Sequence, residues 1–312
     1  MQPQVQLMES ERLAAAEAAA LRWRRVAGTL SCHHTGVGPT GGFCPRSMTT
    51  GGDAGCLPKK LASRLGLLFA NSSVLDYGCG MGRYGHFFTA HAPTVRWTGV
   101  DGAEGVEETT KGHVRFAELT DPLPSAIRRL GPAPWDYVLS IEVAEHIARR
   151  DEPTFLHSLA SSARAGIVVS WARLGQGGTA HINCQASDYV VCAMALLGWE
   201  RDESTERWLA SSVGRHLHDC GWLRTTLLAF RPRPRREAAL CGAAEAAGTA
   251  AGSLFPCALP VTPSRTFAAA YLRATRTRCP YVRDGCNSTT YPYSLESVLA
   301  PKSSHLLEDL EG

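Results

Sequence analysis

The stretch that most constrains this chain is VLDYGCGMGRYG, residues 74–85. An apolar run leads to Asp76, and four glycines follow it: Gly78, Gly80, Gly82 and Gly85. Glycine permits sharp turns and close backbone contact with a ligand, and the first turn of a helix offers unpaired N–H groups. The pattern therefore predicts a strand, a ligand-binding loop and then a helix over about 82–90. The last three glycines also match G-x-G-x-x-G, so the glycines alone leave a dinucleotide open as the ligand.

Asp76 favours a cationic ligand over a phosphate. A pyrophosphate on this loop would lie within a few ångströms of the carboxylate, and two like charges in a partly buried site repel by roughly several kcal/mol. A ligand that carries an ammonium and a sulfonium would instead be attracted, and S-adenosylmethionine (SAM) is such a ligand. The alternatives are a nicotinamide nucleotide and a glycine-rich turn that binds nothing.

The segment resembles the first motif of class I SAM-dependent methyltransferases, in which an acid ends the first strand and a Gly-x-Gly-x-Gly loop follows. The next apolar run, VRWTGVD, ends in Asp101, at about the separation expected of two-strand nucleotide units. The resemblance implies that Asp101 binds the ribose and that Leu119 flanks the adenine. The cofactor-binding residues that it implies are Asp76, Gly78, Gly80, Gly82, Asp101, Gly102, Leu119 and Ile141.

Apolar runs alternate with helix-compatible stretches from residue 72 onward. The runs are SSVLDYG, VRWTGVD, HVRFAEL, WDYVLSI and GIVVSWA, and two more strands are expected near 199–212 and 223–231. Continuous apolar strands separated by helices predict a parallel sheet covered on both faces. We therefore expect an α/β fold: a Rossmann-like, doubly wound, seven-stranded and mostly parallel sheet in a three-layer α/β/α sandwich. The family resemblance implies that the last strand is antiparallel.

Changes in composition divide the chain into four parts. Residues 1–27 are rich in alanine and predict an N-terminal helix, and 28–71 predict a loop and a short helix that act as a lid. Residues 72–232 are the predicted SAM-dependent methyltransferase core. The remainder is charged, then small and featureless, which predicts that 233–312 is disordered or loosely attached.

Three acidic or basic side chains follow the fourth predicted strand at helical spacing: Glu142, Glu145 and His146. On a helix such residues share one face, and two carboxylates with an imidazole can hold a divalent cation such as Mg²⁺. The pattern resembles the Glu-x-x-Glu-His of Hen1-type RNA 2′-O-methyltransferases and of ubiquinone-biosynthesis O-methyltransferases; in the RNA enzymes a later His completes the site. His181 takes that place here, so the implied metal ligands are Glu142, Glu145, His146 and His181. The alternative is that these side chains bond within the fold and hold no metal.

Without a metal, His181 becomes the candidate general base, because an imidazole titrates near neutral pH. The candidate catalytic residues are His181, Glu142 and His146. The surrounding GQGGTAHIN resembles a GQGGxxHxN loop of a poorly characterised branch of methyltransferase-like proteins. The segment Gly41-Gly42-Phe43-Cys44 matches a second feature of that branch, which implies that residues 30–57 cover the SAM site.

Charge and cysteine content limit which partners and which cellular compartment the sequence predicts. A net charge of +3 does not by itself indicate a nucleic-acid partner. The N-terminus lacks the apolar core of a secretory signal, and no uninterrupted apolar stretch of ~18 residues predicts a membrane span. Eleven cysteines without a Cys-x-x-Cys pair predict free thiols in a reducing compartment rather than a disulfide scaffold. We therefore expect a cytoplasmic protein without membrane contact.

The most specific functional prediction is a SAM-dependent methyltransferase that acts on an oxygen or nitrogen of a small-molecule acceptor. The alternatives are a Hen1-like, metal-assisted RNA 2′-O-methyltransferase, a non-catalytic SAM-binding protein and a nicotinamide-dependent oxidoreductase. The sequence specifies neither the acceptor nor the oligomeric state.

Overall fold

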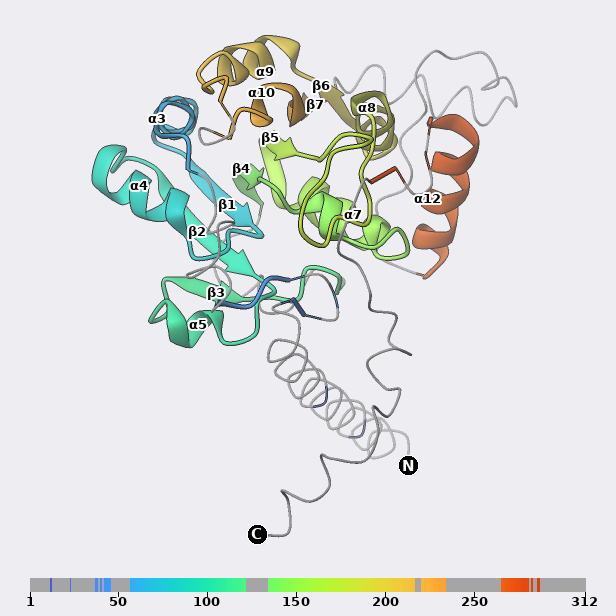
Figure 1. Ribbon diagram of the computed structural model, residues 1–312, viewed down its shortest axis with the longest axis horizontal. Coiled ribbons are helices and arrows are strands. Elements are labelled where there is room, and N and C mark those ends of the chain that lie inside the picture. The colour runs from blue at the N-terminus through green and yellow to red at the C-terminus, as the bar shows by residue number, and fades with distance from the viewer. Residues whose placement is uncertain are drawn as a thin grey trace, which may run out of the picture.

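The computed structural model describes residues 12, 23, 37–38, 40, 42–45, 57–121, 134–216, 220–233, 265–280, 282 and 285–286. Within these ranges the chain forms one seven-stranded sheet between layers of helices (Figure 1). The strands are β1 (Ser73–Tyr77), β2 (Arg96–Asp101), β3 (Val114–Phe116), β4 (Trp135–Ser140), β5 (Ala163–Ser170), β6 (Trp199–Arg201) and β7 (Leu227–Pro232). Apart from Arg12 and Trp23, the predicted N-terminal helix lies outside the described residues.

The strand order is β3-β2-β1-β4-β5-β7-β6. Strands β1 to β5 pair in parallel, whereas β7 is antiparallel to both β5 and β6. The predicted doubly wound, mostly parallel α/β fold with a reversed last strand is confirmed. The order changes direction between β1 and β4, and the carboxyl ends of the five parallel strands share one edge, which is where ligands bind in open sheets of this kind.

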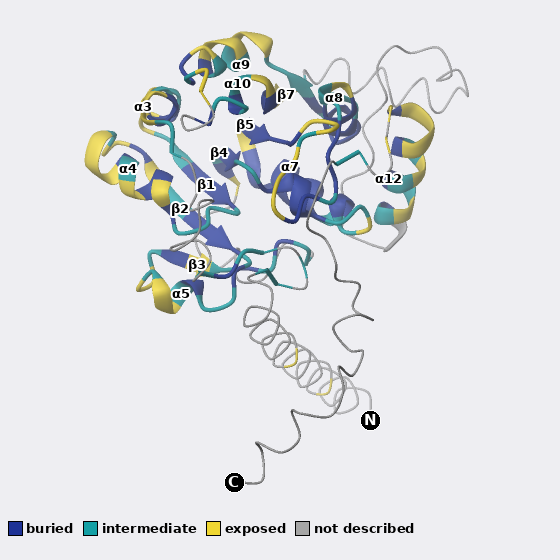
Figure 2. Ribbon diagram, in the orientation of Figure 1, coloured by how far each residue is buried: buried dark blue, intermediate teal, exposed yellow. Residues whose placement is uncertain are grey.

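Two helical layers cover the sheet. One contains α3 (Lys59–Leu68), α4 (Arg83–His91), α9 (Glu203–Ala210) and α10 (Leu223–Thr226), and the other contains α7 (Glu152–Ser162), α8 (Ser187–Leu196) and α12 (Arg265–Arg278). The short helix α5 (Val106–Thr109) packs beside β3. Figure 2 shows the strands and α7 largely buried, while α4, α9 and α12 carry exposed residues on their outer faces.

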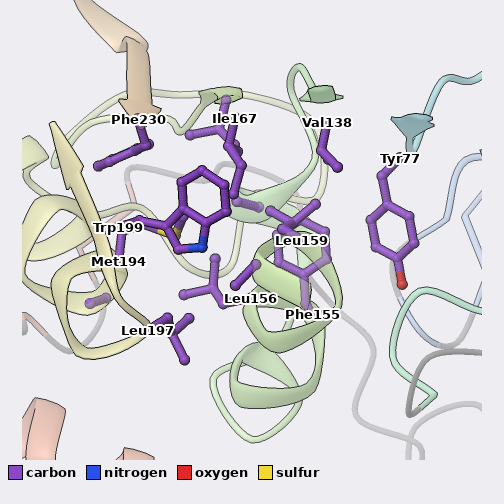
Figure 3. Packing of buried hydrophobic residues seen from close by; sticks show 14 of the residues in the cluster. Tyr77, Val138, Phe155, Leu156, Leu159, Ile167, Met194, Leu197, Trp199 and Phe230 are labelled. Atoms are coloured by element: carbon purple, nitrogen blue, oxygen red, sulfur yellow. The ribbon is translucent and has the colours of Figure 1, made fainter. Parts of the chain in front are cut away.

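Alternation along the strands divides the apolar side chains between the two layers. Leu75 and Tyr77 of β1 pack with the α7 and α8 residues, whereas Val74 packs with the α3 residues. In the larger cluster Trp199 lies among Phe230, Ile167 and neighbours from α7 and α8 (Figure 3). Full burial of each such side chain contributes about 1.5–3 kcal/mol to the stability of the fold. This cluster therefore holds the carboxyl edge of the sheet in place.

The strand predicted over 199–212 is wrong beyond Arg201, because helix α9 follows directly. Asp202 caps that helix: its side chain accepts a hydrogen bond from the backbone N–H of Thr205 at 3.1 Å. An Asp ahead of acidic residues is a helix-start signal. The strand predicted over 223–231 is also shortened, since Leu223–Thr226 form α10 and β7 begins at Leu227.

The prediction that residues 233–312 are disordered or loosely attached is wrong for α12. Phe267 and Tyr271 on this helix are buried in the larger core cluster. The Tyr271 hydroxyl donates to Oε1 of Glu152 on α7 at 2.7 Å. The two aromatic residues are spaced i, i+4 and form one apolar stripe, which the featureless sequence around them obscures.

The prediction of free thiols is also wrong. Disulfides join Cys184 to Cys286 and Cys192 to Cys279, and Cys44 and Cys220 are disulfide-bonded as well. Cys79 is the free cysteine among those described. The two resolved pairs span 102 and 87 positions, so cysteine spacing gave no signal of them.

Each helix in the described part of the chain is too short or too polar to cross a bilayer.

We expect Tyr271→Phe to lower the free energy of unfolding by about 1–3 kcal/mol, because it removes a donor from a buried carboxylate and keeps the ring. Urea denaturation measures this. Tyr137→Phe is the matched control, since that hydroxyl has no hydrogen-bond partner among the described residues, and its change should stay within about 0.5 kcal/mol. Equal changes in the two variants would show that α12 is not anchored through Glu152.

Candidate functional site

A cavity of about 660 Å³ opens at the carboxyl edge of the sheet, where the strand order changes direction. The loops after β1, β2, β3, β4 and β5 line it, together with three residues of the predicted lid and two that precede β7: Thr40, Gly42, Phe43, Trp222 and Leu223. The sequence-predicted residues on its wall are Asp76, Gly78, Gly80, Asp101, Gly102, Leu119, Ile141, Glu142, His146 and His181. Gly82 and Glu145, which were also predicted, are not on the wall.

The loop after β1 turns back under the cavity. Gly78 has φ +88°, and a Cβ there would lie 2.5 Å from Cγ2 of Val143, so both the backbone and the space require glycine. Its N–H donates to the carbonyl of Val100 at 2.8 Å. Gly82 begins α4 in a left-handed conformation and packs against His113, so it turns the chain and does not face the ligand space.

Asp76 is held by a tryptophan from the neighbouring strand. The indole Nε1 of Trp97 donates to Oδ2 of Asp76 at 3.0 Å. The same ring fills the space beside two glycines: a Cβ on Gly85 would lie 2.6 Å from it, and one on Gly99 would also collide. Gly85 therefore leaves room for the Trp97 ring, and it is not among the predicted cofactor-binding residues.

The Trp97 ring continues into a stack of side chains. His113 stacks on Trp97 with centroids 4.7 Å apart, and His86 stacks on His113 at 3.9 Å. This stack packs against the glycine loop on the side away from the cavity. It thereby restricts the orientation of the Asp76 carboxylate.

The carboxyl group of Asp76 changes its charge near neutral pH. The side chain is 2% exposed, and burial raises its pKa to about 7; the Trp97 bond opposes this rise, and the charge of Asp101 adds to it. A cation in the cavity would favour the ionised carboxylate. The site is therefore suited to a positively charged group beside the glycine loop.

Asp101 links the end of β2 to the glycine loop. Its Oδ2 accepts the N–H of Gly80 at 2.7 Å, and its Oδ1 accepts that of Ala103 at 2.8 Å. Burial raises the pKa of Asp101, and these two hydrogen bonds oppose the rise. Each carboxylate oxygen accepts more than one hydrogen bond, so Asp101 can fix the loop and still receive ligand hydroxyls.

Part of the predicted lid lies on this wall. Val37 and Phe43 form an antiparallel bridge, and a Cβ on Gly42 would lie 3.2 Å from the carbonyl oxygen of Gly102. The Phe43 ring contacts that of His146 edge-on, with centroids 5.1 Å apart. The hydroxyl of Thr40 donates to Glu118 at 3.0 Å. The described residues of this segment therefore contact both the β2 end and the β4 end of the cavity.

The spacing predicted that Glu142 shares a helical face with Glu145 and His146. In the structure it does not. Ala144–His146 form a single 3₁₀ turn, and Glu142 precedes it with a left-handed φ of 58°. Its Oε1 accepts the Ser170 hydroxyl and its Oε2 accepts the Trp222 indole, both at 2.7 Å. Burial raises the pKa of Glu142, and both bonds oppose this rise.

The other three predicted metal ligands converge. One ligand atom from each of Glu145, His146 and His181 lies within 4.8 Å of the other two, and Nε2 of His181 is 3.9 Å from Oε1 of Glu145. His146 donates from Nδ1 to the carbonyl of Ala180 at 3.1 Å, which leaves Nε2 as the lone-pair nitrogen of the neutral ring. The structure does not bring Glu142 into this group.

Glu145 is the unusual member of that group. It is fully buried, and neither carboxylate oxygen makes a well-formed hydrogen bond to a described residue. Burial raises the pKa of Glu145 well above its usual range and the charge of Glu142 raises it further, while the nearby backbone N–H groups of Glu145 and Ala172 oppose the rise. A buried carboxylate without hydrogen bonds is costly, and a bound cation would relieve that cost. Two imidazoles and a carboxylate are a suitable donor set for a divalent metal.

The wall residues that the sequence did not identify include Arg83, Tyr84, Trp222 and Leu223. Tyr84 lies in the first turn after the glycine loop, where any side chain can face a ligand, so its position was a usable signal. Its hydroxyl is buried without a hydrogen-bond partner in the described part of the chain. Trp222 had no signal, since the reversed direction of β7 brings it to this edge.

The sheet order, the ligand crevice and the acid-glycine loop define a Rossmann-like α/β domain of the doubly wound class. No protein-family model matches the chain, and no curated protein matches it.

The solved structures that are similar to this chain include methyltransferases. One is the Burkholderia thailandensis 1,6-didemethyltoxoflavin-N1-methyltransferase with bound 1,6-didemethyltoxoflavin and S-adenosylhomocysteine: 17% identical, covering 61% of this chain and 85% of that chain, TM-score 0.43. Another is the methyltransferase CcbJ from Streptomyces caelestis, 13% identical over 62% of this chain and 98% of that chain, TM-score 0.43. The methyltransferase domain of bacterial CtHen1 is 20% identical, and the match covers 37% of this chain and 66% of that chain, with a TM-score of 0.31. At these values the activity must be argued from the site itself.

We expect Trp97→Phe to raise the pKa of Asp76 above its present value of about 7, because the lost indole bond stabilises the ionised carboxylate. A ¹³C NMR titration of the Asp76 carboxyl group measures this. Trp199→Phe, on strand β6 away from Asp76, is the control and should leave the titration unchanged. A midpoint that stays or falls in Trp97→Phe would show that the indole does not hold the carboxylate.

Proposed function

We propose that this chain is a SAM-dependent methyltransferase that transfers a methyl group to an oxygen or nitrogen of a small-molecule acceptor. The observation that carries the proposal is the Asp76 carboxylate, which is buried at the foot of a glycine loop and faces a 660 Å³ cavity. A phosphate at that position would be repelled, whereas an ammonium or sulfonium would be attracted.

The wall supports a definite orientation for SAM. Asp76 would receive the ammonium group, with Gly78 and Gly80 against the methionine portion. Asp101 would accept the ribose hydroxyls, and Leu119 would contact the adenine. This orientation directs the sulfonium methyl toward Glu142, His146 and His181, the polar side chains at the β4 and β5 ends of the cavity.

The chemistry requires mainly positioning. A lone pair on the acceptor attacks the methyl carbon in line with the C–S bond, that bond breaks, and its electrons return to sulfur to give S-adenosylhomocysteine. The proton of the acceptor passes to His181 as general base. Glu142, fixed by Ser170 and Trp222, orients the acceptor.

The charge of the wall favours a neutral or cationic acceptor. Four carboxylates line the described part of the cavity, from Asp76, Asp101, Glu118 and Glu142, and Arg83 is the one arginine or lysine there. Binding to nucleic acid relies on cations that neutralise phosphates. A small molecule without phosphate therefore suits this wall better than an RNA end does.

Thermal denaturation with SAM and with NAD⁺ tests the proposal. A ligand that binds only the folded state stabilises it by about 2.7 kcal/mol at 100 times its Kd. We expect SAM to raise the Tm and NAD⁺ to leave it unchanged. Stabilisation by NAD⁺ alone would overturn the assignment, and SAM binding without methyl transfer to any acceptor would indicate a non-catalytic SAM-binding protein.

The pH dependence of SAM affinity follows from Asp76. With its pKa at about 7, the carboxylate is largely neutral at pH 6 and charged at pH 8, so affinity should rise as pH increases through 7. Above about pH 8 the α-amino group of SAM loses its proton and affinity should fall. Isothermal titration calorimetry measures this profile, and Asp76→Asn should weaken binding and remove the rise. A rise that persists in Asp76→Asn would assign it to another group.

Metal-assisted methylation of a hydroxyl is a second candidate function, and the two orphaned oxygens of buried Glu145 favour it. Glu145, His146 and His181 would hold the ion. Such a cation lowers the pKa of an acceptor hydroxyl and orients it for attack. In this version Glu145 supplies charge and His146 is oriented by its bond to Ala180.

We expect the protein to bind Mn²⁺ and Glu145→Gln to weaken that binding at least about tenfold, because a neutral amide replaces the anionic ligand. Calorimetry without SAM or acceptor measures this. Glu118→Gln is the control, since that carboxylate lines the cavity but lies outside the group of three. Absence of Mn²⁺ binding in the unaltered protein, or methyl transfer that survives EDTA, would dispose of the metal-assisted version.

A further inference from the structure

The loop between β5 and α8, residues 173–185, carries a large part of the cavity wall; we call it the site loop. Gln176, Gly177, Gly178, Thr179 and His181 all line the cavity. The loop contains turns but no helix or strand. A loop of this kind needs contacts from elsewhere to keep one conformation.

Residues 280–286, which follow α12 and Cys279, supply such contacts; we call them the strap. Within the strap's described residues, the carbonyl of Gly285 accepts the N–H of Gly175 at 2.6 Å. Val282 pairs twice with the side chain of Gln185: its carbonyl accepts from Nε2 at 2.9 Å, and its N–H donates to Oε1 at 3.2 Å. The Cys184–Cys286 disulfide, with Cα atoms 5.0 Å apart, adds a covalent link.

The strap approaches the site loop too closely for a larger residue at one point. A Cβ on Gly285 would lie 2.7 Å from the carbonyl oxygen of Cys184 and would collide with the side chain of Leu174. The strap and the site loop are therefore in close backbone contact at both ends of the loop.

The covalent link lies beside the proposed chemistry. Sγ of Cys184 is 3.8 Å from Nδ1 of His181. The N–H groups of Ile182 and Asn183 both donate to the carbonyl of Glu145 at 2.9 Å. Fixing residue 184 therefore fixes the stretch that holds His181 against Glu145.

A buried carboxylate joins α12 to the same stretch. Oε2 of Glu152 accepts from Nδ2 of Asn183 at 2.9 Å, and its Oε1 accepts from the hydroxyl of Tyr271 at 2.7 Å. Its further partners are Arg149 and Tyr189. Glu152 thus links helix α12 to the site loop. Because the strap follows α12 in the chain, this link places the strap beside the site loop.

We propose that the strap is part of the acceptor site: it holds the site loop in its working conformation, and Cys184 is a positioning residue that acts through the Cys184–Cys286 disulfide. The term acceptor site rests on the proposed function, but the holding of the loop does not. A residue 102 positions downstream of Cys184 thereby sets the geometry of His181 and Glu145.

The second disulfide offers a matched control. Cys192–Cys279 joins α8 to the residue after α12 and has no member in the site loop. The two bridges close loops of similar length, with separations of 102 and 87. Because the effect on the unfolded chain varies only with the logarithm of loop length, removal of either should cost similar global stability.

The experiment is hydrogen exchange, followed by mass spectrometry, on the full-length protein and on the double variants C184S/C286S and C192S/C279S without ligand. We expect peptides within 173–185 to exchange at least about tenfold faster in C184S/C286S and less than about threefold faster in C192S/C279S. Calorimetry with SAM on the same samples should give affinities within about twofold of one another, because the Asp76 and Asp101 wall is separate from the strap.

A second variant covers failure of the first to fold. Gln185→Met removes the two hydrogen bonds to Val282, together with the one that Nε2 donates to Oδ1 of Asn183, and keeps both disulfides. It should also speed exchange in the site loop. Unchanged exchange there in Gln185→Met and C184S/C286S, or equal acceleration in both disulfide variants, would overturn the strap. Failure of the unaltered protein to bind SAM would overturn the proposed function and leave the exchange result to decide the strap.

Discussion

Burial of one carboxylate at the end of β1 is the constraint on which the site depends. Asp76 lies at the point where the sheet order changes direction, and it is removed from water except toward the cavity. The indole of Trp97 stabilises its charge, and two glycines leave room for that indole. This end of the cavity therefore disfavours a phosphate and favours a cation, which is the physical basis for proposing SAM rather than a dinucleotide as the ligand.

The opposite end of the cavity is organised by a different principle. Here the polar groups come from the loops after β4 and β5 and from the turn before β7. Glu142 is fixed by Ser170 and Trp222, while Glu145 is buried without such partners. Carboxylates with raised pKa values gathered beside imidazoles are typical of functional sites. The strap from beyond α12 then limits the movement of the loop that completes this end.

The sequence was informative where chemistry and chain position coincide. Asp76, Asp101 and the glycines follow their strands directly, so a parallel sheet must bring them to one edge. The sequence was misleading where the backbone takes an unusual conformation. The left-handed φ of Glu142 removes that residue from the predicted helical face. The sequence was silent about Trp222, whose place depends on a reversed strand, and about the cysteine pairs, which are distant along the chain.

The sequence by itself determined the alternating strands and helices and the acid-glycine loop, because these follow from local periodicity and from the special conformations of glycine. The tertiary structure alone decided three things: that Gly85 accommodates Trp97, that Glu145 joins His146 and His181 without Glu142, and that α12 with its strap belongs to the folded core. Each depends on contacts between residues far apart in the chain, and such contacts leave no periodic signal in the sequence.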